Sequence, residues 1–252
     1  MEKREILKEI EIKGFNKTLW NKAGKAMHRY NMINPGDKIV VGISGGKDSL
    51  VMLNTLIRVK LIAGFDFEII PIFISKTEKI SLEVEKIKKY ISEIGLKLIV
   101  KSTTIDKIVF EDKKVKNPCF LCSRIRRGVL YTMMKELGAN KLALGHHLDD
   151  IIETFFMNMF YQGNMNQMKP IYRSEQYGYE IIRPLSFVEE DTIIKYARKA
   201  KLPIINIDCK FSSVKLDSKR VETKELIKNL EKKNPNIRRN MYSAIFNISK
   251  EE

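Results

Sequence analysis

The stretch VGISGGKDSL at residues 41–50 constrains the fold more than any other part of the chain. The apolar run at 38–43 predicts a short buried strand, and the spacing of apolar residues over 48–62 predicts a helix. The adjacent glycines then lie in a strand-to-helix turn, where unpaired backbone N–H groups favour an anion and glycine permits close approach. A plain turn is the alternative. We interpret the turn as a phosphate-binding loop, whose residues are Ser44, Gly45, Gly46, Lys47, Asp48 and Ser49.

This loop does not fit the P-loop of nucleoside triphosphatases, which needs four residues between its first glycine and its Gly-Lys pair, then Ser or Thr. Here only three residues separate Gly42 from Gly46, and Asp48 follows Lys47. The loop instead resembles the pyrophosphatase loop of the N-type ATP pyrophosphatases, which split ATP into AMP and pyrophosphate. Lys47 would then offset charge on the leaving pyrophosphate.

Strands and helices alternate after the loop. Further strands are expected at 67–74, 96–102, 141–145 and after 180, and helices at 79–94, 123–137 and 149–161. Repeated strand–helix units predict an α/β fold: a Rossmann-like parallel sheet with helices on both faces. Ligands of such sheets bind at the carboxyl ends of the strands, where both the glycine loop and the segment after Leu144 lie.

Basic helical segments are expected to flank this sheet. We divide the chain into a basic N-terminal segment, an ATP pyrophosphatase domain and a basic C-terminal segment, at residues 1–35, 36–208 and 209–252. The net charge of +15, with 46 Lys and Arg against 31 Asp and Glu, indicates a polyanionic partner, and we favour nucleic acid. The alternative is lysine enrichment of genomic origin on solvated helix faces.

The apolar runs are shorter than the roughly 20 residues that span a membrane, and the first residues contain no signal-peptide region. We therefore expect a cytoplasmic protein with no membrane partner. The 44% of hydrophobic residues supports a real core.

The segment GHHLDD at 145–150 is the second candidate for site chemistry. A carboxylate from Asp149 or Asp150 could hold Mg²⁺, and a histidine such as His146 could donate to a phosphate. The alternative is structural, because carboxylates at a helix start also cap backbone N–H groups. The shared sheet edge with the glycine loop favours function.

The cysteines are the third candidate. Cys119 and Cys122 form a CxxC pair close to several arginines, which favours thiolates, and Cys209 is the remaining cysteine. An odd number in a cytosolic-looking chain argues against a disulfide scaffold. A redox pair, a zinc site completed by histidine and an iron–sulfur site all remain open; three thiolates on a [4Fe–4S] cluster would leave one iron without a protein ligand.

Four segments together resemble the tRNA-cytidine 2-sulfurtransferases, which make 2-thiocytidine at position 32 of tRNA. They are the SGGKDS loop, CFLCSRIRRGVLY at 119–131, LGHHLDDIIETFFMNMFYQGNM at 144–165 and IIRPLSFVEEDTIIKYARKAKLPII at 181–205. The likeness runs from about residue 15 to 247. The glycine loop marks only the wider superfamily, whereas the GHHxDD segment and the methionine-rich helix behind it are specific.

This resemblance implies ATP, Mg²⁺ and a [4Fe–4S] cluster as cofactors, with the anticodon stem-loop of tRNA as partner and sulfide or a cysteine desulfurase as sulfur source. A homodimer is also possible. The reaction would adenylate the C2 oxygen of a pyrimidine, which sulfur then displaces. A cluster-free or zinc-bearing persulfide enzyme, or a small-molecule sulfur or nitrogen transferase, are the alternatives.

The resemblance also assigns roles to residues. The cluster ligands would be Cys119, Cys122 and Cys209, and in the persulfide alternative Cys122 or Cys209 would carry the sulfur. Lys47, Asp48, Asp149 and Asp150 would be catalytic, with Asp48 and Asp149 holding Mg²⁺. Nucleotide contacts would come from the loop residues 44–49 and from Ile74, Gly145 and His146.

Overall fold

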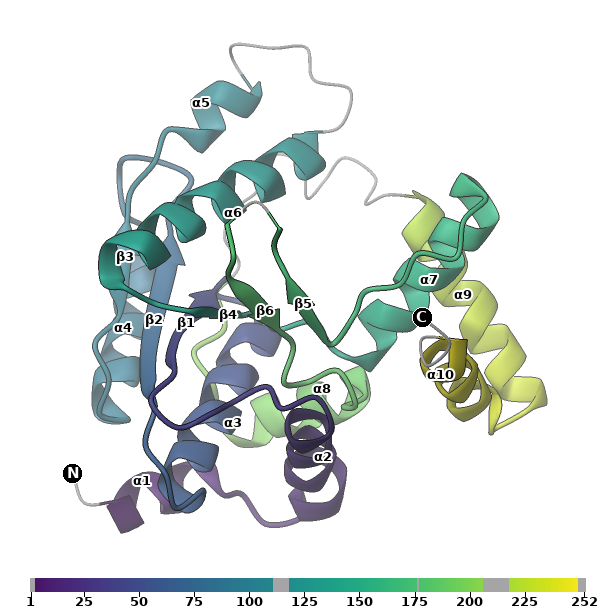
Figure 1. The fold of residues 1–252 in the computed structure, drawn as a ribbon, viewed down its shortest axis with the longest axis horizontal. Coiled ribbons are helices and arrows are strands. Elements are labelled where there is room, and N and C mark those ends of the chain that lie inside the picture. Colours follow the sequence, from purple (N-terminus) through teal and green to yellow (C-terminus); the bar gives the residue numbers. More distant parts are fainter. Residues whose placement is uncertain (1–2, 111–117, 176, 206–217, 249–252) are drawn as a thin grey trace.

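A six-stranded sheet forms the centre of the protein (Figure 1). The computed structural model describes residues 3–110, 118–175, 177–205 and 218–248. The strand order is β3-β2-β1-β4-β6-β5. The parallel strands are β1 (Lys38–Ile43), β2 (Glu68–Ile74), β3 (Ile99–Lys101), β4 (Lys141–Ala143) and β6 (Glu180–Ile182). The α/β sheet expected from the strand–helix alternation is therefore confirmed.

The exception to the parallel arrangement is β5 (Ile171–Arg173), which pairs antiparallel with β6 at the sheet edge. Residues 163–179 are polar and lack strand periodicity, so the sequence alone predicts a loop there. The strand forms because backbone hydrogen bonds to β6 stabilise it, although its own sequence has no strand pattern. It spans only three residues.

Helices cover both faces of the sheet because the strands alternate their side chains. Ile39, Val41 and Ile43 point to one face and pack with α3 (Lys47–Ile62), α4 (Leu82–Glu93) and α8 (Glu190–Lys199). Val40 points to the other face, which is covered by α5 (Ile105–Phe110) and α6 (Pro118–Leu137). Each face thus has its own hydrophobic core.

The N-terminal segment packs into the first of these cores. It comprises α1 (Lys3–Ile10), a π-helical turn at Asn16–Trp20 and α2 (Asn21–Arg29). The Tyr196 hydroxyl of α8 donates a hydrogen bond to Ile10 O at 2.9 Å, and its ring lies 5.2 Å from the Trp20 ring. The segment is therefore anchored to α8, although its separation at residue 35 stays a prediction.

Three helices form a group of their own beside the sheet (Figure 1). They are α7 (Leu148–Gln162), α9 (Ser218–Lys233) and α10 (Ile237–Ile248), and they share an apolar cluster. The C-terminal segment is thus helical over its described residues, as expected. Within the described part of the chain, no helix has the length and apolar character needed to cross a lipid bilayer.

The strand order places a switch point next to β1. From β1 the chain steps outward to β2 and β3, and then returns to lay β4 on the other side of β1. The turns that leave β1 and β4 therefore meet at the switch point, where a crevice opens at the carboxyl ends of these strands. Both sequence-predicted turns border this crevice.

A buried ion pair holds the opposite, amino-terminal edge of the sheet. The Lys141 ammonium lies 2.9 Å from Asp37 Oδ2 and 3.2 Å from Glu180 Oε2, and it donates to Met32 O at 3.0 Å. Only 2% of the Lys141 side chain is exposed. Burial raises the pKa of Asp37, but hydrogen bonds from Lys141 and Asn140 outweigh it and lower that pKa below its ordinary value.

We predict that Lys141→Met lowers the free energy of unfolding by about 3–5 kcal/mol at neutral pH, because it leaves the Asp37 carboxylate buried without its cation. The depressed pKa means that this stabilisation is present above the ordinary carboxyl pKa of about 4 and is lost as the pH falls. Urea unfolding of both proteins at pH 7 and pH 3 should therefore show a smaller difference at pH 3.

Lys38→Met is the matched control, because the Lys38 ammonium lies 3.4 Å from Glu68 and both side chains are about half exposed. That exposed pair should contribute at most about 1 kcal/mol. Equal losses in the two variants would contradict a special role for the buried pair.

Candidate active site at the carboxyl edge of the sheet

The glycine loop joins β1 to α3 in a conformation suited to an anion. Gly45 has a φ of +86°, in the left-handed region that favours glycine. Ser49 Oγ accepts a hydrogen bond from Ser44 N at 3.1 Å and donates one to Gly46 O at 2.9 Å, which closes the loop. No side chain among the described residues caps α3 at Gly46, so its first backbone N–H groups remain available to a phosphate.

The turn after β4 packs directly against this loop through Gly145. A Cβ at this position would lie 2.9 Å from the backbone carbonyl carbon of Asp48 and 3.0 Å from Ser49 N. Both atoms belong to the backbone, so any larger residue would push the loop away. Glycine at position 145 therefore lets His146 and Asp150 approach the phosphate-binding loop.

A cavity of about 440 Å³ opens between these two turns and α6. Its volume falls in the range of small-molecule sites. The polar and charged side chains that line it are Ser44, Asp48, Ser49, Lys76, Cys122, Ser123, Arg126, Arg127, His146 and Asp150. The cavity thus combines the glycine loop, a cysteine and a cationic wall.

Most of the sequence-predicted site residues meet in this cavity. Those that line it are Ser44, Asp48, Ser49, Ile74, Cys122, Gly145, His146 and Asp150. Gly45 and Gly46 shape the loop without lining the cavity, and Lys47 and Asp149 turn elsewhere. Their proposed contacts with the nucleotide and the metal stay predictions.

One cysteine, Cys122, reaches the cavity from the N-terminal part of α6. Cys122 lines it, with Arg126 one helical turn further along, and the backbone of Cys119 lies one turn earlier in the same helix. Burial lowers the pKa of Arg126, and the negative charge of a Cys122 thiolate opposes this shift. The Cys119 side chain and Cys209 lie outside the described residues. Within the described part, no group of three or more His, Cys, Asp or Glu side chains is arranged to hold a metal ion.

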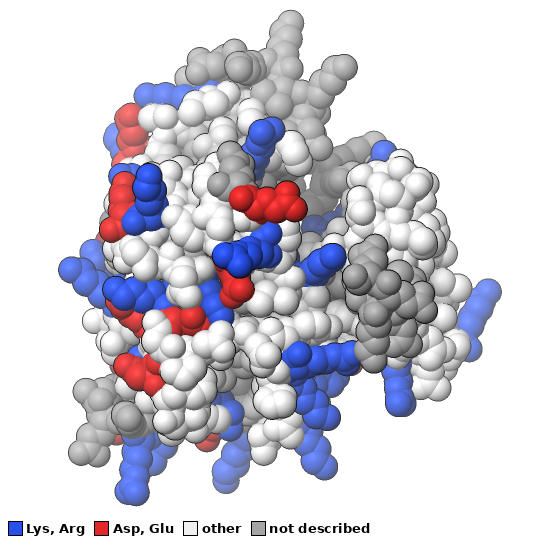
Figure 2. Space-filling model, in the orientation of Figure 1, with Lys and Arg blue, Asp and Glu red and all other residues white. Residues whose placement is uncertain are grey.

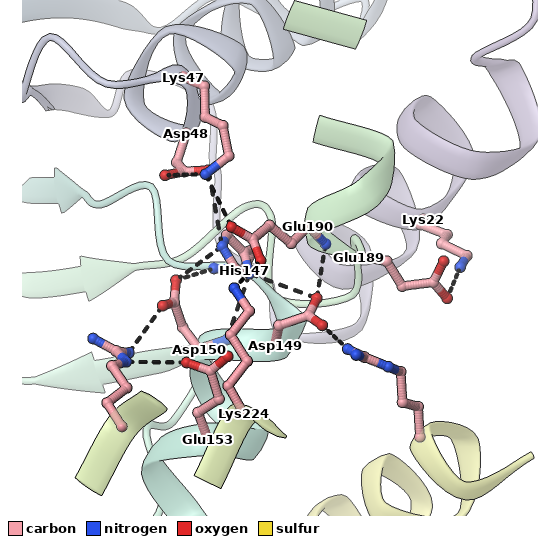
Figure 3. Close-up of polar contacts among 12 residues, drawn as sticks. Lys22, Lys47, Asp48, His147, Asp149, Asp150, Glu153, Glu189, Glu190 and Lys224 are labelled. Carbon is pink, nitrogen blue, oxygen red and sulfur yellow. Dashed lines mark hydrogen bonds and ion pairs between the residues drawn. The ribbon is translucent and has the colours of Figure 1, made fainter. Parts of the chain in front are cut away.

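The two aspartates after the histidines have different partners (Figure 3). Asp150 completes a capping box at the start of α7: His147 N donates to Asp150 Oδ2 at 3.1 Å, and Asp150 N donates to His147 Nδ1 at 3.4 Å. Asp149 instead accepts from Glu190 N at 2.7 Å and from Arg238 of α10. His147 is thus the N-cap, and Asp149 joins α7 to the start of α8.

Lys47 does not line the cavity, and the carboxylates of Glu190 and Asp48 hold its ammonium group. Its ammonium lies 3.1 Å from Glu190 Oε1 and 3.2 Å from Asp48 Oδ1, and Lys224 of α9 lies 2.6 Å from Glu190 Oε2 (Figure 3). Burial raises the pKa of Glu190, but hydrogen bonds from Lys224 and Lys47 lower it to about 2. Burial lowers the pKa of Lys47, but Asp48 and Glu190 outweigh it and raise that pKa. Glu190 and Lys47 are therefore both charged at neutral pH.

Two buried atoms of cavity-lining residues make no hydrogen bond among the described residues: His146 Nδ1 and Asp48 Oδ1, the latter with the Lys47 ammonium 3.2 Å away. Arg183 Nε is likewise buried without a hydrogen bond there. Burial and the nearby positive charge of Arg183 lower the pKa of His146 to about 4, so its imidazole is neutral at pH 7. Burial and the charge of Arg127 lower the pKa of Arg183 to about 10. Unpaired buried polar atoms are costly, so they favour a polar ligand in the cavity.

Sequence reasoning missed Glu190, Lys224 and Arg183. Glu190 lies in the run EED, which reads as an ordinary acidic helix start, and Lys224 is one of many lysines in the tail. Only the fold brings them to the glycine loop, so no local pattern could have singled them out.

The network predicts opposite effects for two substitutions on affinity for inorganic pyrophosphate. Glu190→Gln should raise affinity roughly tenfold, because it frees Lys47 and removes a negative charge beside the loop. Lys224→Gln should lower affinity a few-fold, because Glu190 is then neutralised by Lys47 alone. Titration calorimetry at low salt measures both.

The double variant Glu190→Gln/Lys224→Gln should behave like Glu190→Gln, since Lys224 acts through Glu190. A Lys224→Gln effect of full size in the Glu190→Gln background would contradict this coupling. Lys22→Gln is the matched control, because Lys22 pairs with the neighbouring Glu189 at 2.8 Å.

Comparisons with known proteins agree with this geometry. The family model described as the PP-loop domain matches residues 17–243. The computed fold is similar to that of the U34-tRNA thiolase NcsA from Methanococcus maripaludis with its [4Fe–4S] cluster, with a TM-score of 0.72 and 23% identity over 98% of this chain and 79% of that chain. At that identity the likeness establishes the shared fold.

Curated relatives are closer in sequence. The tRNA-cytidine(32) 2-sulfurtransferase of Neisseria meningitidis serogroup A is 36% identical over 249 residues, which cover 97% of this chain and 76% of the relative. The enzyme of the same name from Burkholderia vietnamiensis is 37% identical over 250 residues, covering 98% and 72%. The resemblance inferred from the motifs is thereby confirmed, and the chain belongs to the tRNA-cytidine(32) 2-sulfurtransferase family of PP-loop proteins.

Proposed function

We propose that this protein is an ATP-dependent tRNA thiolase that replaces the C2 oxygen of a cytidine, at position 32, with sulfur. One observation carries the proposal: the phosphate-binding loop and Cys122 line the same cavity. A nucleotide and a sulfur-bearing group can therefore reach the same substrate atom. Family membership supplies the substrate class.

The first step activates a poor leaving group. The C2 oxygen of the base attacks the α-phosphorus of ATP, and the bond to pyrophosphate breaks, leaving an adenylated base. The backbone N–H groups at the start of α3, with Ser44 and Ser49, bind the phosphates, and Lys47 offsets the charge of the departing pyrophosphate. Sulfur then attacks C2, and the carbon–oxygen bond breaks to release AMP.

Asp48 and Asp150 are the residues that fit a magnesium ion. Asp48 Oδ1 is buried without a hydrogen-bond partner among the described residues, and Asp150 lines the same cavity. Carboxylate oxygens are the ligands that Mg²⁺ prefers, and the ion would neutralise phosphate charge. Asp149 is a weaker candidate, because it does not line the cavity.

Cys119, Cys122 and Cys209 would hold a [4Fe–4S] cluster. The described part fits, because Cys122 lines the cavity beside Arg126 and Arg127, whose positive charges favour a thiolate. When bound through three cysteines, such a cluster offers an iron that can hold sulfide. The chain's own contribution is to keep the Cys122 thiolate at the same cavity as the nucleotide loop.

The positive charge fits an RNA substrate. Figure 2 shows Lys and Arg side chains spread over this face and bordering the hollow beside the α7, α9 and α10 group. With a net charge of +15, contacts to phosphates would supply much of the affinity. The anticodon stem-loop would present an unpaired base, and rotating such a base into the cavity costs little free energy. A tRNA substrate implies a cytoplasmic enzyme supplied by sulfide or a cysteine desulfurase.

Mass spectrometry of tRNA nucleosides tests the proposal. Cells that lack the gene should lose 2-thiocytidine, and the wild-type gene should restore it. Genes that encode Asp48→Asn or Cys122→Ser should not restore it, while Lys22→Gln, outside the cavity, should. Unchanged 2-thiocytidine in the deletion strain would contradict the function, and restoration by both site variants would contradict the site.

A further inference from the structure

Three tyrosine rings gather where the hairpin of β5 and β6 meets α6, a place that the proposed reaction does not use. The Tyr177 ring centroid lies 4.8 Å from that of Tyr131 and 6.5 Å from that of Tyr179, with the planes of Tyr177 and Tyr179 parallel within 2°. Tyr131 is buried, whereas 47% of Tyr177 is exposed. A buried ring thus supports an exposed one, which gives the exposed ring a fixed orientation. We call these three residues the tyrosine group.

Helix α6 connects the tyrosine group to the cavity. Tyr131 follows Leu130 on α6, and both Leu130 and Arg127 line the cavity. Burial raises the pKa of Tyr131, and the positive charges of Arg127 and Arg183 oppose this shift, so both cations lie near its ring. An exposed aromatic ring that packs on a buried ring near two arginines is suited to a negatively charged chain that carries flat rings.

We propose that the tyrosine group is a stacking site for the unpaired RNA base next to the base that enters the cavity. The inference rests on the proposed function and adds a recognition site to it. Bases in RNA loops stack on aromatic side chains, while the neighbouring phosphates contact arginines. Stacking at this site would pull the two bases apart and leave the target base unstacked at the mouth of the cavity.

Two substitutions at Tyr177 separate stacking from other contributions. Tyr177→Phe keeps the aromatic ring and should bind an anticodon stem-loop RNA within about twofold of wild type. Tyr177→Leu keeps apolar volume but removes the ring, and should weaken binding by roughly 5- to 150-fold. The dependence of affinity on salt should not change, because no phosphate contact is removed. Fluorescence anisotropy with the full chain measures both, and thermal unfolding checks that each variant is folded.

The fluorescence of a base analogue in the RNA would not change if Tyr177 had only a structural role. With 2-aminopurine next to the target cytidine, wild type and Tyr177→Phe should quench the fluorescence on binding, and Tyr177→Leu at saturating concentration should not. Tyr161→Leu is the matched control, because Tyr161 is similarly exposed but lies on α7, with its ring 5.0 Å from the Lys219 ammonium.

Wild-type affinity and quenching in Tyr177→Leu would overturn the stacking site and leave the tyrosine group with only a role in holding the hairpin. Equal losses in Tyr161→Leu and Tyr177→Leu would also overturn it. Failure of the wild-type protein to bind the RNA would instead overturn the proposed function, so the two failures are distinguishable.

Discussion

The close contact between two backbone turns is the constraint on which the site depends. Gly145 lies so near Asp48 and Ser49 that no side chain could stand between them. This contact brings the end of β4 against the loop that follows β1, at the point where the strand order reverses. The start of α7 is thereby aligned with the start of α3, and α6 closes the cavity with Cys122 and its arginines. Through this contact the glycine loop and Cys122 come to line the same cavity.

The residue pattern of short stretches predicted the strands and helices that depend on short-range interactions. The strand at 38–43 and the helix from 48 agree with β1 and α3 within one residue, because apolar runs, glycines and helical spacing act over short distances. β5 was missed because its pairing with β6 stabilises a stretch with no strand periodicity of its own. Glu190 and Lys141 were missed for a similar reason: each acquires its role from partners more than 30 residues away in sequence.

Ion pairs connect the C-terminal helices to the residues around the glycine loop (Figure 3). Arg220 of α9 pairs with Asp150 at 3.0 Å, and Arg238 of α10 pairs with Asp149. Lys224 reaches Glu190, which holds Lys47 of the loop. Acidic residues at the starts of α7 and α8 thus have cations from the tail as partners. The basic tail therefore stabilises the site carboxylates as well as adding positive charge for RNA.

The central claim is that an oxygen of the RNA base attacks ATP at this cavity. Its most direct test uses RNA with oxygen-18 at C2 of the target cytidine, incubated with the enzyme, ATP and a sulfur source. Mass spectrometry of the AMP released then follows the label. The account predicts that each AMP formed with a thiolated base carries one oxygen-18 atom. Thiolated RNA accompanied by unlabelled AMP would contradict it.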